Sequence, residues 1–325
     1  MPIEPAHGPL PGLRQVAADA GPLYLANALI GFIFAASGPV AIILSVGARG
    51  GLGEAALASW IFGSFFINGL VTLLFCTLYR QPLVFFWTIP GTVLVGPALG
   101  HLAWPEVVGA FVATGALMLV LGLSGFVRRA MQAVPMPIVM GMVAGVFLRF
   151  GLGLVHAVRD DFWIAAPMVA VFIALSASAA WGRRLPPLIG ALVVGAVAIA
   201  LFGRFQGGAG SVGGLGAHVL AHPEFVLPVF SWRAMVELVV PLAITVLVVQ
   251  NGQGIAVLDA VGHKAPINAV AVACGAGSMV AALVGTVSTC LTGPVNALIS
   301  SSGEKHRHYT AGLAVGVLAL AFGLF

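Results

Sequence analysis

Apolar runs long enough to cross a lipid bilayer recur along almost the whole chain. A helix needs about 20 apolar residues to span the hydrocarbon core. Charged residues make up only 7% of the 325 residues, whereas soluble domains carry about 25%. A soluble fold is therefore excluded, and we expect an all-α polytopic membrane protein. Eleven candidate spans can be marked, at about 21–46, 54–79, 82–100, 105–127, 136–157, 161–182, 186–204, 234–259, 266–284, 286–302 and 307–325.

The third and the tenth of these segments are interrupted in the same way. Residues 82–97 read PLVFFWTIPGTVLVGP, and residues 284–299 read VGTVSTCLTGPVNALI. Each is a short β-prone run, then a Pro/Gly break, then an apolar segment too short to cross a bilayer alone. Interrupted segments at matching positions in two halves are the best sequence indication of a transporter's binding site. Such a backbone is tolerated at membrane depth only where protein or a water-filled cavity satisfies its polar groups.

The two halves of the chain also resemble each other. ASGPVAIILSVG at 36–47 in the first span matches NGQGIAVLDAVG at 251–262 in the eighth, and the two broken segments match in order. Seven spans precede a Gly-rich connector at 205–233, and four follow it. We therefore expect a seven-plus-seven repeat whose last three spans are missing, and a natural protein of eleven spans is the alternative. An odd number of spans per half makes the halves inverted, as alternating access by inverted repeats requires.

Positively charged residues predict which way the chain faces, because inner loops carry an excess of Lys and Arg. With the N-terminal segment 1–20 inside, nine such residues fall in inner segments and four in outer ones. The inner ones are Arg14, Arg80, Arg128, Arg129, Arg183, Arg184, Lys264, Lys305 and Arg307, and the outer ones are Arg49, Arg159, Arg204 and Arg233. We therefore expect a cytoplasmic N-terminus without a cleavable signal peptide.

Three stretches resemble the benzoate:proton symporter family of bacterial inner membranes. They are NGLVTLLFCTLYRQPLVFFWTIPGTVLVGPAL at 68–99, VVPLAITVLVVQNGQGIAVLDAVGH at 239–263 and VGTVSTCLTGPVNALI at 284–299. The resemblance runs from about residue 25 to the end of the chain. It implies the fold of the broader nucleobase and anion transporters, with short strands and half-helices in spans 3 and 10.

In that fold a core domain carries the substrate and moves against a gate domain. The resemblance implies that the core comprises 21–127 and 234–325, that 128–204 is the first part of the gate, and that gate spans 12–14 are absent from this chain. It also implies that a homodimer forms through gate helices.

The two breaks supply a candidate anion site. If 88–90 and 290–292 are extended, short helices begin near Gly91 and Gly293, and their N–H groups and positive dipole ends point to one place. Two such ends could hold a carboxylate without an arginine. The alternative is that the prolines at the breaks only kink ordinary helices. The other polar candidates around the breaks are Thr88, Thr92, Thr289, Thr292 and Asn296.

Three amides, Gln250, Asn251 and Gln253, lie in the middle of the eighth span, where polar side chains are costly unless they face protein or a cavity. We expect them to donate hydrogen bonds to substrate and to cap broken helix ends, and helix–helix contact is the alternative. In the nucleobase relatives a carboxylate occupies about this position, so neutral amides favour an anionic substrate. Residues 252–254 should interrupt the eighth span where Ser37 and Gly38 interrupt the first.

An aromatic acid needs a flat apolar wall, and residues at the breaks could supply it. Phe86 and Trp87 precede the first break, Ile89 lies within it, and Leu291 lies at the second. The alternative is that at least one aromatic residue of 85–87 faces lipid, because neighbours on a strand point opposite ways.

Ionisable residues inside a membrane are functional candidates by default. Asp259 and Glu237 lie near opposite ends of the eighth span, so the alternative for each is a place at the membrane interface. Asp259 is the better candidate for proton coupling. His263, His306 and His308 fall in predicted inner loops, and we expect them to be solvated.

These features predict a secondary active transporter that imports benzoate or a related aromatic carboxylate with protons, by an elevator-like movement. A nucleobase or other small-anion transporter on the same fold is the alternative, and a membrane-embedded enzyme or a passive channel is a weaker one. The sequence contains no metal-ligand pair, cofactor motif or nucleic-acid patch. The expected partners are therefore a small aromatic carboxylate, protons and the lipid bilayer.

Overall fold

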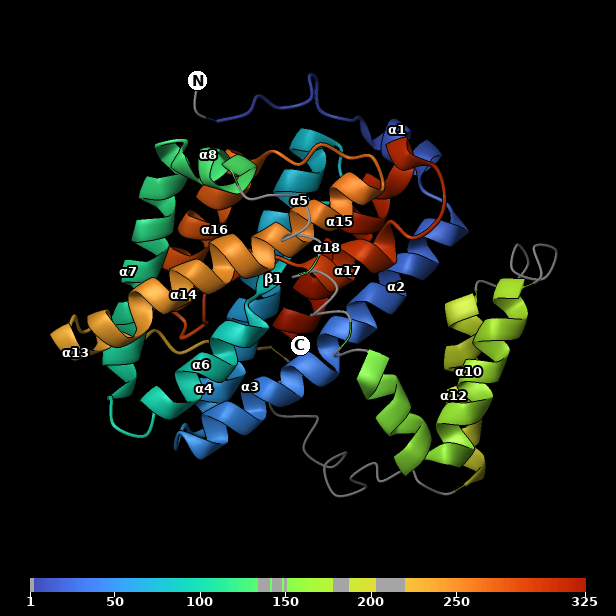
Figure 1. Ribbon diagram of the computed structural model, residues 1–325, viewed down its shortest axis with the longest axis horizontal. Helices are drawn as coiled ribbons and strands as arrows, with labels where there is room; N and C mark the ends of the chain where they lie inside the picture. The colour runs from blue at the N-terminus through green and yellow to red at the C-terminus, as the bar shows by residue number, and fades with distance from the viewer. Residues whose placement is uncertain (1–2, 134–140, 142–147, 149–150, 178–186, 203–219) are drawn as a thin grey trace. The chain divides into compact units, whose positions relative to one another are not determined.

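The computed structural model describes residues 3–133, 141, 148, 151–177, 187–202 and 220–325. The chain divides into two compact units, a larger one made of 1–139 and 220–325 and a smaller one made of 140–219. Both units are built mainly of helices (Figure 1). The mainly helical architecture predicted from the apolar runs is therefore present, together with one small strand pair.

Five helices of the described residues are long and apolar enough to cross a membrane. They coincide with the first, second, fourth, eighth and eleventh predicted spans, and shorter helices occupy most of the others. The long helices are built from α2 (Pro22–Ala36) and α3 (Gly38–Arg49); α4 (Glu54–Phe62), η1 (Gly63–Ile67) and α5 (Asn68–Tyr79); α7 (Trp104–Leu123); α13 (Trp232–Ala234), η3 (Met235–Val239), α14 (Val240–Ile244), η4 (Thr245–Gln250) and α15 (Asn251–Ala260); and η5 (Lys305–Arg307) with α18 (His308–Leu324). The fifth predicted span lies mostly outside the described residues.

Small residues bring the helices of the larger unit into close contact. Helix α16 (Ile267–Ala282) packs on α7, and a Cβ added to Gly275 would lie 2.4 Å from the backbone nitrogen of Leu119. Helix α18 approaches α5 in the same way, because a Cβ on Gly69 would lie 3.1 Å from the carbonyl oxygen of Gly316. Such contacts are typical of membrane helices, whose association depends on close packing of backbones.

The two interrupted segments meet as a two-stranded antiparallel sheet. Strand β1 (Phe85–Trp87) pairs with β2 (Thr289–Leu291), with Phe86 opposite Cys290. Each strand leads into a short helix, α6 (Ile89–Ala98) after β1 and α17 (Gly293–Ile299) after β2. The strand and half-helix expected at each break are thus both present, and the prolines do not simply kink continuous helices.

Side chains satisfy the outer edges of this small sheet. Thr72 accepts from the Phe85 N–H at 2.9 Å and donates to the Phe85 carbonyl at 3.2 Å. Asn296 accepts from the Val84 N–H at 3.0 Å, and Asn251 accepts from the Leu291 N–H at 2.8 Å. These bonds replace water, which is what an irregular backbone at membrane depth requires.

Helix α6 begins two residues earlier than the predicted start near Gly91. Thr88 is the N-cap residue, and only Thr88 of 88–90 has extended backbone angles. Pro90 lies in the first turn, where a proline fits because its missing N–H needs no helical partner. The predicted start of α17 at Gly293 and the extended backbone at Thr292 are confirmed.

The first and eighth spans differ at their predicted interruptions. The first breaks at Ser37, between α2 and α3, as expected. The eighth does not break at 252–254, which lie inside the continuous helix α15, and its irregularities are the π-helical segments η3 and η4. Gly254 allows close packing instead, because a Cβ on it would lie 2.9 Å from the carbonyl oxygen of Leu291.

The N-terminal segment lies on one face of the larger unit, which we call the inner face. Glu4 accepts from the N–H groups of Asn268 and Ala269 at the start of α16, and its carboxylate lies 3.7 Å from the Arg128 guanidinium. Arg80 donates to the Pro9 carbonyl at 3.0 Å. Cations predicted to be inside therefore share this face with the N-terminal segment.

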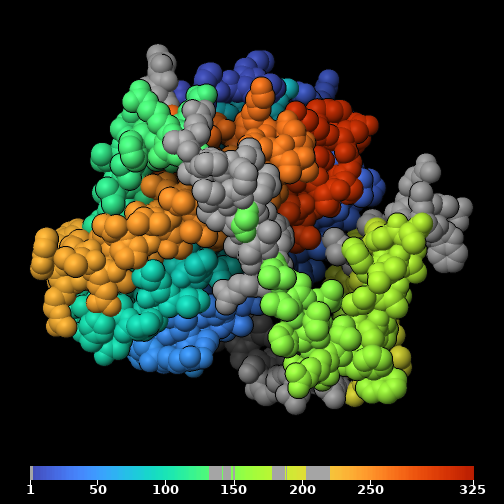
Figure 2. All heavy atoms as spheres, in the orientation of Figure 1, coloured from blue at the N-terminus to red at the C-terminus, as the bar shows by residue number. Residues whose placement is uncertain are grey.

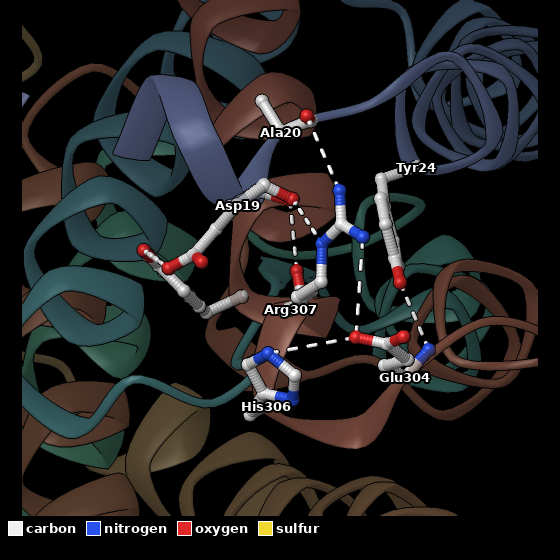
Figure 3. A network of polar contacts seen from close by, with 8 residues as sticks. Asp19, Ala20, Tyr24, Glu304, His306 and Arg307 are labelled. Carbon is white, nitrogen blue, oxygen red and sulfur yellow. Dashed lines mark hydrogen bonds and ion pairs between the residues drawn. The ribbon is translucent and has the colours of Figure 1, made fainter. Parts of the chain in front are cut away.

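Arg307 completes that face through the contacts drawn in Figure 3. Its Nε donates to the carbonyl of Asp19 at 2.7 Å, and its guanidinium lies 4.8 Å from the centre of the Tyr24 ring. The Tyr24 hydroxyl accepts from the Glu304 N–H at 2.8 Å. This network ties the residues before α2 to the loop between α17 and α18.

An extended segment, 220–231, crosses the opposite or outer end of the larger unit. The Val226 N–H donates to the Leu283 carbonyl and the Val229 N–H to the Pro105 carbonyl, each at 2.9 Å. The segment lies so close to α7 that a Cβ on Gly109 would be 2.2 Å from the Val229 carbonyl oxygen. This end of the predicted connector 205–233 is thus bonded to several helix ends, and 205–219 lie outside the described residues.

The smaller unit contains α10 (Phe162–Ala177) and α12 (Pro187–Leu201), which pack against each other. Met168 of α10 fills the space at Gly195 of α12, where a Cβ would lie 2.7 Å from its sulfur. Arg183 and Arg184, which were predicted to lie inside, fall outside the described residues, as does Arg204.

Candidate functional site

A shallow apolar hollow lies beside the point where the two breaks meet. It encloses only about 10 Å³, so a ligand would rest on it rather than inside it. Four of the predicted residues line it: Phe86, Trp87, Ile89 and Thr292. Pro39, which belongs to the predicted interruption of the first span, also lines it, and Phe34, Ala35 and Val295, which were not predicted, complete the lining. Phe34, Ala35 and Pro39 flank the predicted break at Ser37 and Gly38, so their nearness to that break was the available signal.

The aromatic wall of the hollow is held rigidly. The Phe65 ring contacts Phe86 edge-on at 5.4 Å between centroids and Trp87 at 5.2 Å. All three residues of β1 are buried, so the alternative that one of them faces lipid is wrong. The indole N–H of Trp87 is buried and has no hydrogen-bond partner among the described residues.

The N-terminus of α6 is capped by hydrogen bonds among its own residues. The Thr88 hydroxyl accepts from the Gly91 N–H at 3.2 Å, and the Thr88 carbonyl accepts from the Thr92 N–H at 2.9 Å. The Thr92 hydroxyl donates to the same carbonyl at 3.0 Å. Thr88, Gly91 and Thr92, predicted as substrate ligands, therefore satisfy one another in this arrangement.

The N-terminus of α17 lacks such a closure. Thr292 occupies the N-cap position, but its side chain makes no capping bond. Thr292 borders the apolar hollow, and Gly293 follows it directly. A donor for a ligand is thus present at the second break, at the position where the first break uses its threonine internally.

Gln253 of α15 is packed against that uncapped end. It is 1% exposed, and neither its amide nitrogen nor its amide oxygen has a partner among the described residues. Its side chain fills the space beside Gly293, where a Cβ would lie 2.5 Å from the Gln253 Cδ. Leaving a buried amide unpaired costs about 1–3 kcal/mol, and native proteins rarely do so without a functional reason.

The other predicted polar residues are bonded within the protein. Asn251 holds β2 through the Leu291 N–H, and its amide nitrogen lies 3.4 Å from the Cys274 sulfur. Thr289 donates to the Asn68 side chain at 2.7 Å. Gln250 lies 3.7 Å from the Cys290 sulfur, and Asn296 holds Val84. In this arrangement these side chains build the strand pair on which the hollow rests.

The two proton-coupling candidates lie at opposite ends of the eighth span, as expected. Asp259 is exposed on the inner face and lines a cavity of about 470 Å³ with Tyr79, Arg128 and Lys264. Glu237 lies at the other end, where it pairs with His101 at 2.9 Å. His101 follows α6 in the chain and was not singled out by the sequence analysis.

Two histidines that were expected to be solvated are buried. His263 and His308 are each 4% exposed, and their ring nitrogens lie 3.1 Å apart. Burial, together with the nearby His308 and Lys305, lowers the pKa of His263 to about 4. The error arose because tertiary packing of the α15–α16 loop against α18 encloses them. His306, by contrast, is exposed as predicted.

Comparison with known proteins shows extended similarity. The family model for benzoate membrane transport proteins (BenE) matches residues 18–325. The inner membrane protein YdcO of Escherichia coli (strain K12) is 29% identical over 301 residues, covering 91% of this chain and 73% of the relative. The benzoate membrane transport protein of Acinetobacter baylyi is 26% identical over 304 residues, covering 89% and 72%.

A solved structure is similar in fold. The transmembrane domain of the cyanobacterium bicarbonate transporter BicA superposes with a TM-score of 0.50 and 18% identity. The match covers 91% of this chain and 81% of that one. At this identity the similarity concerns the fold alone.

Proposed function

Because this chain belongs to the benzoate membrane transport protein family, we propose that it carries benzoate or a closely related aromatic carboxylate across the membrane together with protons. The protein is a multi-pass inner membrane transporter and not an enzyme. The observation that supports the substrate assignment is the buried, unpaired amide of Gln253, which packs beside Gly293, the residue after Thr292 of the aromatic hollow.

In the proposed complex the two ends of the substrate meet different surfaces. The ring lies against Phe86, Trp87 and Ile89, which offer the flat apolar contact that an aromatic acid needs. The carboxylate accepts from the Gln253 amide nitrogen and the Thr292 hydroxyl. A hydrogen bond to a charged group contributes about 1.5–3 kcal/mol, so two such bonds select a carboxylate over a neutral ring.

Proton coupling and an elevator-like movement belong to the same proposal. Asp259 in the inner cavity and the Glu237–His101 pair at the outer end are the ionisable groups proposed to take part. The paired strands and close helix contacts support movement of the core as a rigid body, since its two broken segments are bonded to each other.

A nucleobase is the second candidate substrate, and the chemistry of Gln253 is the reason to keep it. An amide offers both donors and an acceptor, and a nucleobase edge presents both. A carboxylate can use only the donors. Competition between the two ligands at the same site would separate these possibilities.

Uptake of labelled benzoate into proteoliposomes with an imposed pH gradient tests the proposal. We expect accumulation with the outside acidic, loss of accumulation when an ionophore collapses the gradient, and strong inhibition by excess unlabelled benzoate. Benzoate uptake that is the same with and without the pH gradient would refute proton symport. Absence of saturable benzoate uptake, together with saturable uptake of labelled uracil, would move the substrate to the nucleobase class.

A further inference from the structure

An apolar groove opens on the larger unit between α7 and the eighth span. Its volume is about 220 Å³, and every lining residue is apolar. Figure 2 shows the green surface of α7 and α8 (Phe126–Ala133) beside the orange surface of α14. The lining residues are Leu117, Leu121, Phe126, Val127, Ala130, Met131, Val240, Ala243, Ile244, Leu247 and Val248.

Helix α8 closes one end of the groove and divides sharply into two sides. Phe126, Val127, Ala130 and Met131 face the groove, at the spacing of one helical face. The two residues between them, Arg128 and Arg129, are exposed. A short helix with one apolar side and one basic side is suited to lie along a membrane surface.

The position of α8 identifies which membrane surface this is. Arg128 pairs with Glu4 of the N-terminal segment, so α8 lies on the inner face. The excess of cations on that face marks the cytoplasmic side. Anionic lipids give the cytoplasmic leaflet a negative surface potential, which attracts exposed Lys and Arg by about 1 kcal/mol each.

We propose that this groove binds one acyl chain of an anionic phospholipid of the inner leaflet, with the lipid phosphate held by Arg129. The all-apolar lining suits hydrocarbon and offers no partner to the backbone of a peptide. Arg129 directly precedes the lining residue Ala130 in the chain and is exposed, with no ion pair among the described residues. Arg128, by contrast, lies 3.7 Å from the Glu4 carboxylate. The helix that borders the groove therefore carries an exposed cation without a paired carboxylate among the described residues, and such a cation favours an anionic headgroup over a zwitterionic one.

Binding of defined lipids to the full chain tests the site. The purified protein would be titrated with phosphatidylglycerol or phosphatidylcholine of identical acyl chains, with native mass spectrometry and thermal stability as readouts. We expect phosphatidylglycerol to bind about fivefold more tightly, a difference set by one exposed cation. The substitution Arg129→Gln should remove this preference, because it should weaken phosphatidylglycerol binding much more than phosphatidylcholine binding.

Two further variants separate the headgroup from the chain. Arg49→Gln removes an exposed cation from the end of α3 and should leave the lipid preference intact. Ala130→Leu fills the groove and should weaken both lipids. Equal binding of the two lipids, or a preference that survives Arg129→Gln, would overturn the headgroup assignment. Lipid binding unaffected by Ala130→Leu in a protein of normal thermal stability would overturn the groove assignment.

Discussion

The segments β1–α6 and β2–α17 share one architecture, but they treat their threonines differently. Thr88 caps its own helix with its hydroxyl, whereas Thr292 makes no capping bond and borders the hollow. An unpaired amide, Gln253, is packed beside the second break. The two breaks are therefore not equivalent as binding sites. At the first break the threonine hydroxyl is bonded within its own helix, whereas at the second break the threonine makes no capping bond.

The largest effect should come from closing the space beside the second break. In Gly293→Ala the new methyl group would lie 2.5 Å from the Gln253 Cδ, so this side chain must move. Overpacking costs about 1–3 kcal/mol, and the lost hydrogen bond adds to it, so we expect benzoate uptake to fall roughly hundredfold. Gly96→Ala is the matched control on α6, where the methyl would meet nothing closer than 3.5 Å. Equal uptake by both variants would place the substrate elsewhere.

Replacing Gln253 by leucine should weaken benzoate binding without lowering the stability of the ligand-free protein. The ligand-free protein should unfold at the same or a higher temperature, because an unpaired buried amide costs about 1–3 kcal/mol. Benzoate binding, measured by calorimetry, should weaken by about tenfold or more. A Gln253→Leu protein that is less stable without ligand would show that the amide has a structural partner.

The two threonines provide a matched pair for a smaller effect. Thr88→Val should lower the unfolding free energy by about 1 kcal/mol, as expected for a lost N-cap, with little change in benzoate affinity. Thr292→Val should leave stability nearly unchanged and weaken benzoate binding about tenfold, the low end expected for loss of one hydrogen bond to a carboxylate. The same phenotype in both variants would remove the distinction between the two breaks. Thermal unfolding with and without benzoate measures both quantities.

The smallest expected effect is a pH dependence of stability, and it concerns the histidines that follow α6 and α17 in the chain. His101, after α6, is exposed and paired with Glu237, whereas His308, after α17, is buried against His263. The pKa of His263 is lowered to about 4 from an ordinary 6.5, so the unfolded chain binds this proton more readily between those values. Stability is therefore full above pH 6.5 and falls as the pH drops toward 4.

Thermal unfolding between pH 7 and 4.5 checks this expectation. The midpoint of the natural protein should fall by a few degrees more than that of His263→Asn, which keeps a polar side chain but cannot titrate. Identical pH profiles would show that His263 does not titrate differently in the folded and unfolded states.

The sequence predicts the architecture of the breaks well because their signals are local. Proline and glycine are unfavourable in the interior of a strand or a helix, so their combination at each break indicated where the strand ends and the short helix begins. The break at Ser37 was predicted for the same reason. The prediction of a break at 252–254 was wrong, and Gly254 there packs closely against Leu291, a residue distant in sequence.

Which polar residues make structural hydrogen bonds, and which have no partner in the part of the protein that the structure describes, could not be predicted in the same way. Gln250, Asn251 and Gln253 look equivalent in the sequence, yet Asn251 holds β2 while Gln253 has no partner among the described residues. That difference depends on which side chain meets a strand some 40 residues away. The burial of His263 by α18 is a tertiary effect of the same kind.

The pairing of β1 with β2 imposes an order on the protein's synthesis. Phe86 and its partner Cys290 are 290 − 86 = 204 residues apart, which a ribosome working at about 5–20 residues per second needs roughly 10–40 s to cover. During that interval the β1 edge that β2 will cover has polar groups without their final partners, which hydrocarbon does not tolerate. We therefore expect the β1 edge to be shielded by other protein or by water until β2 has been synthesised. A ribosome stalled before residue 289 would leave this edge unpaired and accessible to quality-control proteases.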